Sequence, residues 1–390
     1  MKDNILSMAK EMEAQLVQDR RYFHQHPELS FEEYGTARYI CKRLDSLGIP
    51  YQEGIAGTGI LAEVKGKAEG KCLLFRADMD ALPVEEKNDV SYCSKNAGVM
   101  HACGHDAHTA VLLNTCELLY RLRDSFSGTI KFAFQPGEET DGGAKPMIDA
   151  GILENPKVDA CIALHVDSDI PAGCIRIRKG PLYASPDNFY ITVKGKGGHA
   201  AEPQHAIDPI LISAEIISQL QAITKQEKNA VVTVATIHGG DATNVIPDMV
   251  SLSGTARSLD CDTRAFLEEN IEGVVRSVCD AFGADYEYEF EKLFPPLVND
   301  ETVANLIAES AIQCFGEEAC IKGGVPTMAG EDFAYFSLER PSALFKLGCR
   351  NEEKNIIAPI HNSLFDIDES ALLCGLSVFT SCALRFLQAK

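Results

Sequence analysis

A short stretch at 100–110, MHACGHDAHTA, concentrates side chains that can hold a metal ion. Imidazole nitrogen, thiolate sulfur and carboxylate oxygen are all common metal ligands. Five residues here offer one of these groups: His101, Cys103, His105, Asp106 and His108. If the backbone is extended through Gly104, Cys103 and His105 point the same way, because side chains alternate along a strand. We therefore expect both to reach one site, on a loop where Asp106 caps a helix over 110–122.

Two familiar zinc patterns are absent from the sequence. The residues between the first two His are not those of HExxH, so no Glu base sits beside the ligands. No H-x-E with a later P-C-x-x-C occurs either, which excludes the zinc-deaminase pattern. A cysteine nucleophile, Cys103 paired with a His, stays an open alternative.

Further acids and a His lie at the ends of predicted strands. Asp78 and Asp80 follow a strand at 71–75, and His165 ends a strand at 158–164. Ligands of open α/β sheets bind outside the carboxyl ends of the strands. We therefore expect these side chains to meet the Cys103–His105 loop at one edge of a sheet.

Glu138 and Glu139 follow a third strand, at 129–134, after Gln135-Pro136-Gly137. Neighbours in a regular strand face opposite ways, so both could not reach one metal ion from such a strand. A turn after Pro136 removes that constraint and allows one carboxylate to act as a base and the other as a ligand.

Strands that alternate with helices predict an α/β fold with a largely parallel sheet. Helical spacing runs from Ile5 and ends near Pro27, and Gly48 caps a second helix. The remaining elements predicted before residue 186 are helices at 36–47 and 144–150 and a strand at 59–64. After residue 294 we expect helices at 301–315, at 328–336 and from 368, and a strand at 344–347.

The pattern changes between 186 and 294, where it has the order β-α-β-β-α-β of the split βαβ unit. The strands are expected at 189–194, 230–237, 250–256 and 286–290, and the helices at 208–224 and 263–282. We therefore predict a ferredoxin-like domain at 186–294, inserted into a discontinuous domain of 1–185 plus 295–390.

The length, charge and cysteine content of the chain limit its domain number, its binding partners and its location. A chain of 390 residues suits two domains. Its formal net charge of -21 argues against nucleic acid or an anionic membrane surface as a partner. The N-terminus has no secretory signal, no apolar run reaches the ~18 residues of a membrane span, and the 14 Cys are irregularly spaced. We expect reduced thiols and a cytoplasmic location.

Motifs along most of the chain resemble those of the zinc-dependent amidohydrolases related to aminoacylase. The closest resemblance is to the branch of hippurate hydrolases, N-acetyl-amino-acid deacetylases and plant auxin–amino-acid conjugate hydrolases. The matching motifs are FHQHPELSFEE (23–33), FRADMDALP (75–83), MHACGHDAHTA (100–110), FQPGEE (134–139), ALHV (163–166), GGHAAEP (197–203), NVIP (244–247), MAGEDFAYF (328–336) and HN (361–362).

The resemblance implies a metallopeptidase-type catalytic domain with two divalent metal ions per subunit. The positions that match the family's ligands are Cys103, which would bridge the ions, His105, Glu139, His165 and His361. Glu138 takes the place of the general base, and Asp80 that of a residue orienting a ligand His. One thiolate among imidazoles and carboxylates suits Zn²⁺, and Mn²⁺, Co²⁺ and Ni²⁺ are also compatible.

The resemblance also implies that the insert is a lid and dimerisation domain, in a homodimer or a tetramer. His199 and Asn244 match positions that contact the substrate, where the His reaches the partner subunit's site. As hydrogen-bond donors they would stabilise the developing oxyanion. Arg257 matches a position that can bind a substrate carboxylate. The implied activity is hydrolysis of the amide bond of N-acyl amino acids, such as N-acetyl or N-benzoyl derivatives.

Other readings stay open at this level. A dipeptidase or aminopeptidase could use the same scaffold, and a metal-binding protein without catalysis could use the same ligands. The roles of Asp78, His101 and His108 are open, and we treat the two His as candidates for orienting the ligands.

Overall fold

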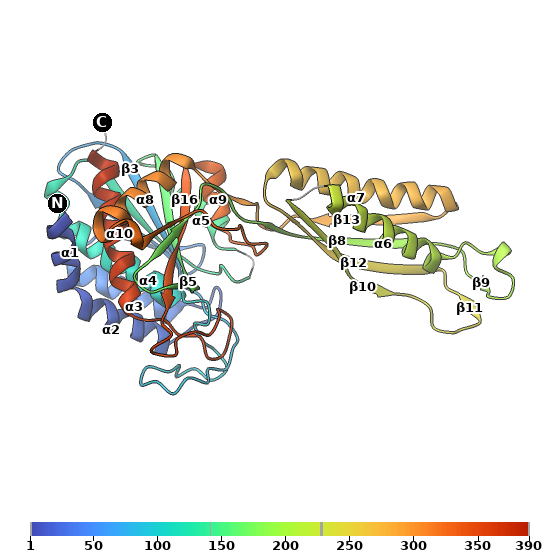
Figure 1. Cartoon of the computed structure of the whole chain (residues 1–390), viewed down its shortest axis with the longest axis horizontal. Coiled ribbons are helices and arrows are strands. Elements are labelled where there is room, and N and C mark those ends of the chain that lie inside the picture. The colour runs from blue at the N-terminus through green and yellow to red at the C-terminus, as the bar shows by residue number, and fades with distance from the viewer. Residues whose placement is uncertain (1, 141, 227–228, 389–390) are drawn as a thin grey trace. The chain divides into compact units, whose positions relative to one another are not determined.

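The computed structural model describes residues 2–140, 142–226 and 229–388. The chain divides into two compact units (Figure 1). The first contains Met1–Gly180, Asn299–Gly324 and Tyr335–Lys390, and the second contains Pro181–Val298 and Val325–Ala334. The predicted insert at 186–294 falls within the second unit, which also takes in the later segment 325–334.

The first unit is built on an eight-stranded sheet with the order β1-β2-β4-β3-β5-β16-β6-β15. Its strands are β1 (Tyr51–Ile55), β2 (Gly59–Lys65), β3 (Cys72–Asp78), β4 (Thr129–Gln135), β5 (Ala160–Pro171), β6 (Ile175–Ile177), β15 (Cys320–Lys322) and β16 (Ser342–Arg350). The four middle strands, β4-β3-β5-β16, are mutually parallel, as the sequence predicted. The flanking pairs β1–β2, β2–β4 and β16–β6 are antiparallel, so the sheet is mixed.

Helices pack against this sheet (Figure 1). They are α1 (Lys2–Glu11), α2 (Glu13–Gln25), α3 (Tyr34–Leu47), α4 (His105–Arg121), α5 (Ala144–Asp149), α8 (Glu301–Phe315), α9 (Ala334–Glu339) and α10 (Ser370–Gln388). Helix α4 packs on β2 to β5, and α10 packs on β3 and β16. Helix α2 lies on α4 and α10, and α1 lies on α10. The predicted first helix is thus two helices, and Gly48 caps α3 with a left-handed backbone, as expected.

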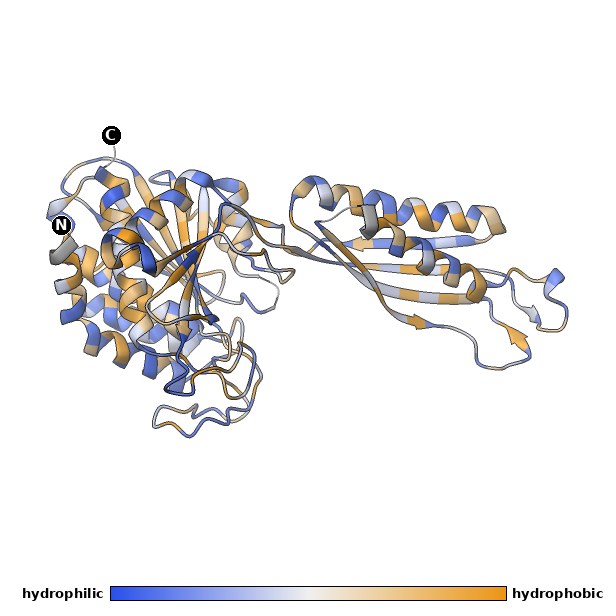
Figure 2. Ribbon diagram, in the orientation of Figure 1, coloured by the Kyte–Doolittle hydropathy of each residue, from blue (hydrophilic) through white to orange (hydrophobic). Residues whose placement is uncertain are grey.

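The sheet and its inner helices share one continuous hydrophobic core. Strand β3 is buried along its whole length, and hydrophobic colouring runs through the middle strands (Figure 2). The prediction that no apolar run reaches the length of a membrane span is wrong for α10, which has the length and apolar composition to cross a membrane, but 72% of its 18-residue apolar window is buried. It is therefore accounted for as a core helix. All 14 cysteines are free thiols.

The second unit has the predicted βαββαβ order. Its elements are β8 (Ser185–Lys194), α6 (Pro209–Gln226), β10 (Ala230–His238), β12 (Met249–Ser258), α7 (Cys261–Phe282) and β13 (Asp285–Glu291). The antiparallel strand order β10-β12-β8-β13 is that of a ferredoxin-like fold. Strand β13, DYEYEFE, alternates aromatic side chains with acids, which suits a sheet with only one face covered by helices. Figure 2 shows the matching hydrophobic and hydrophilic bands along α7.

Short strands were not predicted from the sequence. They are β1, β6 and β15 of the eight-stranded sheet, together with β7 (Gly180–Tyr183), β9 (Gly198–His199), β11 (Val245–Ile246) and β14 (Leu297–Asn299). The helix predicted at 328–336 is wrong for most of its length, because 328–333 forms turns and α9 begins at Ala334.

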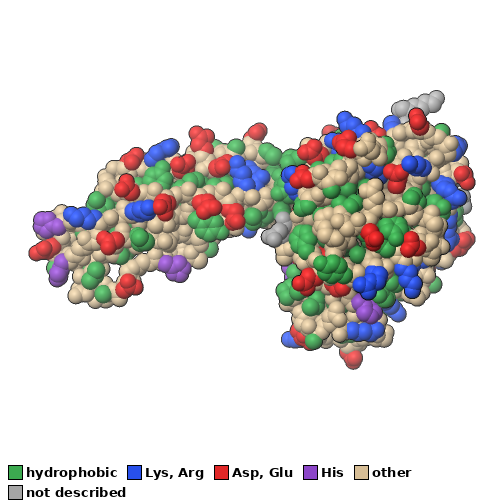
Figure 3. Space-filling model, turned by 180° about the vertical axis from the view of Figure 1, so that it is seen from behind, with side chains coloured by type: hydrophobic (Ala, Val, Ile, Leu, Met, Phe, Trp, Pro, Cys, Tyr) green, Lys and Arg blue, Asp and Glu red, His purple; other side chains and the backbone are tan. Residues whose placement is uncertain are grey.

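Charged side chains of both signs are interspersed over the face drawn in Figure 3. The acidic excess of the chain is therefore dispersed on that face instead of forming one continuous patch.

Candidate metal centre

Three adjacent parallel strands deliver the predicted side chains to one end of the sheet. Strand β3 ends at Asp78 with Asp80 just beyond it, and β4 ends at Gln135 just before Glu138 and Glu139. Strand β5 carries His165, although the strand continues to Pro171 and does not end at this His as predicted. The expectation that these side chains meet at one edge is confirmed, because the strand order β4-β3-β5 makes the strands neighbours.

The loop that carries Cys103 turns sharply at Gly104, which has a φ of +86°. The extended backbone predicted here is therefore wrong. Gly104 takes the N-cap position and α4 begins at His105, so Asp106 lies inside the first turn and is not the cap. A methyl group at position 104 would lie 2.4 Å from a Val166 Cγ and 3.5 Å from the Phe365 ring. Only glycine fits this turn, and the turn brings Cys103 and His105 to one site.

We expect Gly104→Ala to destabilise the fold more than an alanine placed at another left-handed glycine. The backbone conformation alone costs about 1–2 kcal/mol, and the overlap with Val166 adds about 1–3 kcal/mol. Gly151→Ala is the matched control, because Gly151 has a φ of +88° and open space where the methyl would lie. Denaturant unfolding of both variants measures the difference. Equal losses of unfolding free energy would show that the overlap with Val166 relaxes without cost.

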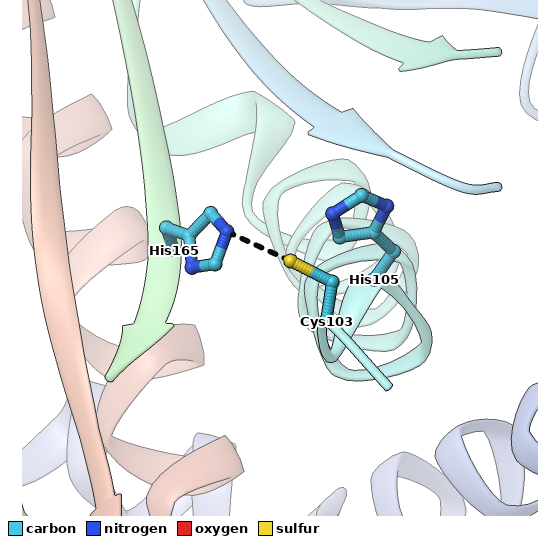
Figure 4. Close-up of side chains that lie close together, drawn as sticks. All are labelled: Cys103, His105 and His165. Carbon is cyan, nitrogen blue, oxygen red and sulfur yellow. Dashed lines mark hydrogen bonds between the residues drawn. The ribbon is translucent and has the colours of Figure 1, made fainter. Parts of the chain in front are cut away.

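Cys103, His105 and His165 form one cluster of side chains (Figure 4). Their ligand atoms lie within 4.8 Å of one another, and Cys103 Sγ is 3.4 Å from His165 Nε2. The His165 Nδ1–H donates to the carbonyl oxygen of Val166 at 2.7 Å. This bond leaves a lone pair on Nε2, the atom that faces Cys103.

A second cluster shares Cys103 and adds Glu139 and His361. His361 Nε2 is 3.5 Å from Glu139 Oε1, and His105 Nε2 is 3.8 Å from the same oxygen. The His361 side chain is 53% exposed, so this cluster is open on one side to solvent. Glu138 lies beside it, within 4.8 Å of both His105 and Glu139. The structure thus brings together all five predicted ligands and the predicted base.

Asp80 hydrogen-bonds to two of the predicted ligands, His105 and Glu139. The His105 Nδ1–H faces Asp80 Oδ1 at 3.2 Å and the Asp80 carbonyl oxygen at 3.0 Å. The other carboxylate oxygen, Oδ2, accepts from the Glu139 backbone N–H and from the Ser30 hydroxyl. Asp80 therefore orients one ligand candidate through its ring and another through its backbone.

Asp78 and His108 form a supporting pair. His108 Nδ1 lies 2.5 Å from Asp78 Oδ1, and His108 Nε2 accepts from the Val166 N–H. Asp78 also accepts from the buried guanidinium of Arg76. Asp78, His105 and His108 are close enough to hold a metal ion. We do not assign that site, since both His108 nitrogens and the Asp78 charge already have protein partners.

Burial favours the uncharged forms of three groups in these clusters. Burial raises the pKa of the Cys103 thiol well above its usual value and lowers the pKa of His165 well below its own. Burial also raises the pKa of Glu139. Reactive thiols have lowered pKa values, so this environment argues against Cys103 as an unaided nucleophile.

Two buried polar atoms without a hydrogen bond indicate whether the site fits a metal ion. His105 Nε2 and Glu139 Oε1 have no hydrogen-bond partner among the described residues. Buried polar atoms are normally paired, and an ion is one recognised reason for an exception. Both atoms face the Cys103 clusters, so the residues present fit a metal ion. His101 is also buried without a hydrogen bond in the described part of the chain, and burial lowers its pKa to about 4.

Sequence reasoning did not single out Glu33, which is buried and supports the turn before Glu138. Its Oε1 accepts from the Gly137 N–H at 2.9 Å, and its Oε2 accepts from the Thr58 hydroxyl. Burial raises the pKa of this carboxyl. Glu33 ends the motif FHQHPELSFEE, so the signal was in the sequence, but its partner lies 104 residues away.

The remaining predicted site residues belong to the second unit. His199 in β9 and Asn244 beside β11 are exposed neighbours, because β9 pairs with β11 and the Ala200 N–H donates to the Asn244 carbonyl oxygen. Arg257 in β12 is half-buried, and its Nη1 donates to the carbonyl oxygen of Asp187 at 3.2 Å.

A mixed α/β sheet with His, Cys and carboxylate ligands at its strand ends is a scaffold for metal-dependent hydrolysis. The chain belongs to peptidase family M20/M25/M40, whose family model matches residues 74–385. It is a hydrolase that acts on amide bonds, in a metal-dependent amidohydrolase family. The family suspected from the motifs is thereby confirmed.

Three similar proteins illustrate the range of the family. Thermostable carboxypeptidase 2 of Saccharolobus solfataricus is 40% identical, over 97% of this chain and 96% of the relative. An N-acetyl-L-cysteine deacetylase of Bacillus subtilis is 37% identical, over 97% and 90%. The crystal structure of a dinuclear metal-binding M20 peptidase of B. subtilis has a TM-score of 0.87 at 34% identity, covering 98% of this chain and all of that one.

Proposed function

We propose that this protein hydrolyses the amide bond of N-acyl amino acids with two divalent metal ions, which the residues of the two clusters would hold. The observation that carries the proposal is that the clusters overlap: Cys103 belongs to both, beside His105 Nε2 and Glu139 Oε1, which make no hydrogen bond among the described residues. His165 would complete one ion's ligands and His361 the other's. Zn²⁺ suits the thiolate best, and Mn²⁺, Co²⁺ and Ni²⁺ suit the other ligands.

Bound metal ions would supply two things, a lower pKa for water and polarisation of the amide carbonyl. Glu138 takes the proton of the attacking water and passes it to the leaving amine nitrogen. Its position supports this role, since it lies beside the ligand candidates but follows a Gly137 turn held by Glu33. Glu139, with its backbone fixed by Asp80, is left to act as a ligand.

In this proposal the second unit supplies the substrate contacts. His199 and Asn244 lie together on the β9–β11 pair, where two hydrogen-bond donors can approach one oxyanion. Arg257 is proposed to bind the substrate carboxylate, and the unit to act as a lid and dimerisation domain in a cytoplasmic homodimer or tetramer. Exposed apolar side chains on this unit support a role in association: Ile210, Leu211, Ile237, Val245 and Met249.

A carboxypeptidase activity is the second candidate, because a relative with that name aligns over nearly the whole chain. The two substrate classes share an amide bond next to an amino acid that carries a free carboxylate. They differ on the acyl side, where one has a small acyl group and the other a peptide. A dipeptidase would require a substrate with a free amine on the acyl side of the scissile amide.

The deciding experiment measures amine release from three panels: N-acyl amino acids, N-blocked dipeptides and free dipeptides. Each is run on protein as purified, after chelation, and after Zn²⁺ or Mn²⁺ is restored. We expect release from N-acyl amino acids that disappears with the chelator and returns with one metal. Release only from dipeptides would move the assignment to a peptidase. Release that ignores the chelator would reject the metal mechanism, and metal binding without any release would indicate a binding protein.

Asp80→Asn is expected to weaken metal binding by ~10–100-fold, as is typical when a group that orients a ligand is altered. The amide keeps the size of the side chain but removes the charge that holds His105 Nδ1–H. Asp159→Asn is the control, because Asp159 accepts from the Cys72 N–H at the opposite end of β3. Chelator competition measures both affinities. Unchanged affinity in Asp80→Asn would remove Asp80 from the proposed role.

A further inference from the structure

A buried arginine, Arg20 of α2, lies behind the metal centre and contacts none of its ligands. Its side chain is completely buried. Its Nε donates to Asp106 Oδ2 at 2.8 Å, its Nη2 donates to Asp366 Oδ1 at 2.8 Å, and its Nη1 reaches Glu369 Oε1 at 3.4 Å. One guanidinium therefore binds three carboxylates.

The partners of Arg20 lie in the two segments that carry the candidate ligands. Asp106 directly follows His105 in the first turn of α4. Asp366 lies shortly after His361, in the segment that leads into α10. Arg20 therefore joins the loop of Cys103 and His105 to the segment of His361.

The same two segments also touch directly. The His361 N–H donates to the Ala102 carbonyl oxygen at 2.7 Å. The Phe365 ring packs against Gly104, since a methyl group at position 104 would lie 3.5 Å from the ring. These contacts fix the backbone but supply no charge to balance Asp106 and Asp366.

Side chains around Arg20 complete a network in which the fully buried Asp106 is bound by both Arg20 and His24. His24 Nδ1 lies 2.7 Å from Asp106 Oδ2, and its Nε2 lies 3.1 Å from Glu86. The Tyr92 hydroxyl donates to the second oxygen of Asp366. In a buried site, carboxylates without a cation between them repel strongly. Without the guanidinium, the two segments would be pushed apart.

We propose that Arg20 is a positioning residue of the metal centre: by binding Asp106 and Asp366 together, it sets the spacing of the ligands on the two segments and thus the affinity for metal. This inference rests on the proposed metal-dependent function. It assigns no contact between Arg20 and the substrate or a metal ion.

Arg43 of α3 provides a matched comparison. It also pairs with two carboxylates, Asp19 Oδ2 at 3.3 Å and Glu117 Oε2 at 2.9 Å, and its side chain is only 18% exposed. Glu117, however, lies about three turns along α4 from His105. Arg43 therefore ties helices together without touching either ligand-bearing segment.

The experiment compares Arg20→Lys with Arg43→Lys in the full-length protein. Lysine keeps the charge but cannot reproduce the planar fork that binds separate carboxylates. Zn²⁺ is titrated into metal-free protein in competition with a chromophoric chelator, and thermal unfolding of the metal-free proteins is recorded beside it. We expect the Zn²⁺ dissociation constant to rise by ~10–100-fold in Arg20→Lys and by less than about twofold in Arg43→Lys. Asp366→Asn is a second, milder variant, expected to weaken binding in the same direction.

Wild-type affinity in both Arg20→Lys and Asp366→Asn would overturn the inference and leave the proposed function intact. Equal weakening in Arg20→Lys and Arg43→Lys would also overturn it, because a general loss of stability would then explain both. If the wild-type protein does not bind Zn²⁺ or Mn²⁺ in the same titration, the proposed function fails, and this inference fails with it.

Discussion

Replacing Glu138 by Gln is expected to reduce kcat by ~10²–10⁴-fold, the usual contribution of a general acid–base group. Glutamine keeps the shape of the side chain but cannot accept the proton of the attacking water. Because Glu138 is proposed as the base and not as a ligand, metal content should remain at the wild-type level. Steady-state kinetics together with metal analysis of the same sample tests both parts.

Glu139→Gln is the paired control for this prediction. The two residues are neighbours in one turn, and Glu139 Oε1, which makes no hydrogen bond among the described residues, faces His105 and His361. We expect Glu139→Gln to lower the metal content, with activity that recovers in part at high metal concentration. If Glu138→Gln loses metal and Glu139→Gln does not, the two roles are exchanged.

The second large effect is expected for Cys103→Ser, which should lose metal and activity together. The change replaces the one sulfur shared by both clusters with a hydroxyl, which is a poor metal ligand because it does not ionise readily near neutral pH. The loss in metal affinity should exceed the ~10–100-fold typical of residues that only orient ligands. Metal analysis and chelator competition measure it.

Cys116→Ser is the matched control, because Cys116 is a fully buried thiol of α4, the helix that follows the Cys103 loop. It should lower stability without changing metal content. A Cys103→Ser protein that keeps its metal but loses all turnover would instead support Cys103 as a nucleophile, with His165 as its partner at 3.4 Å.

The placement of the site could be predicted because it follows from strand order. Asp80 and Glu139 follow the ends of their strands, and His165 directly follows the apolar run at 158–164; the hydrophobic pattern of all three strands is plain in the sequence. Parallel neighbours present those ends at one edge. His361 could be added only through the family resemblance, because no local pattern relates it to residues that lie far earlier in the chain.

The local backbone around the ligands could not be predicted, because distant partners decide it. Asp106 has the chemistry of an N-cap, but its carboxylate is bound by Arg20 and His24, which precede it by more than eighty residues. Gly104 takes the N-cap position instead, with a left-handed backbone. Tertiary contacts thus overrode a local signal at the very residues that form the site.

The sheet edges were missed for a different reason. Strands β6 and β15 are three residues long each, too short for a period-two pattern to stand out. The antiparallel edge pairs were likewise hidden, because the pattern of a strand does not reveal the direction of its neighbour. The βαββαβ unit, by contrast, was predictable because its long helices and alternating strands carry strong periodic signals.

The position of β16 has a consequence for how the protein is made. Strands β5 and β6 follow each other closely in the chain, yet β16, which is synthesised after residues 181–298, lies between them in the sheet. On the ribosome, the sheet of the first unit therefore stays split until its late segment emerges, while the continuous part of the second unit can fold earlier. His361 and α10 emerge later still. The proposed ligand set, which includes His361, is thus complete only after most of the chain has been synthesised.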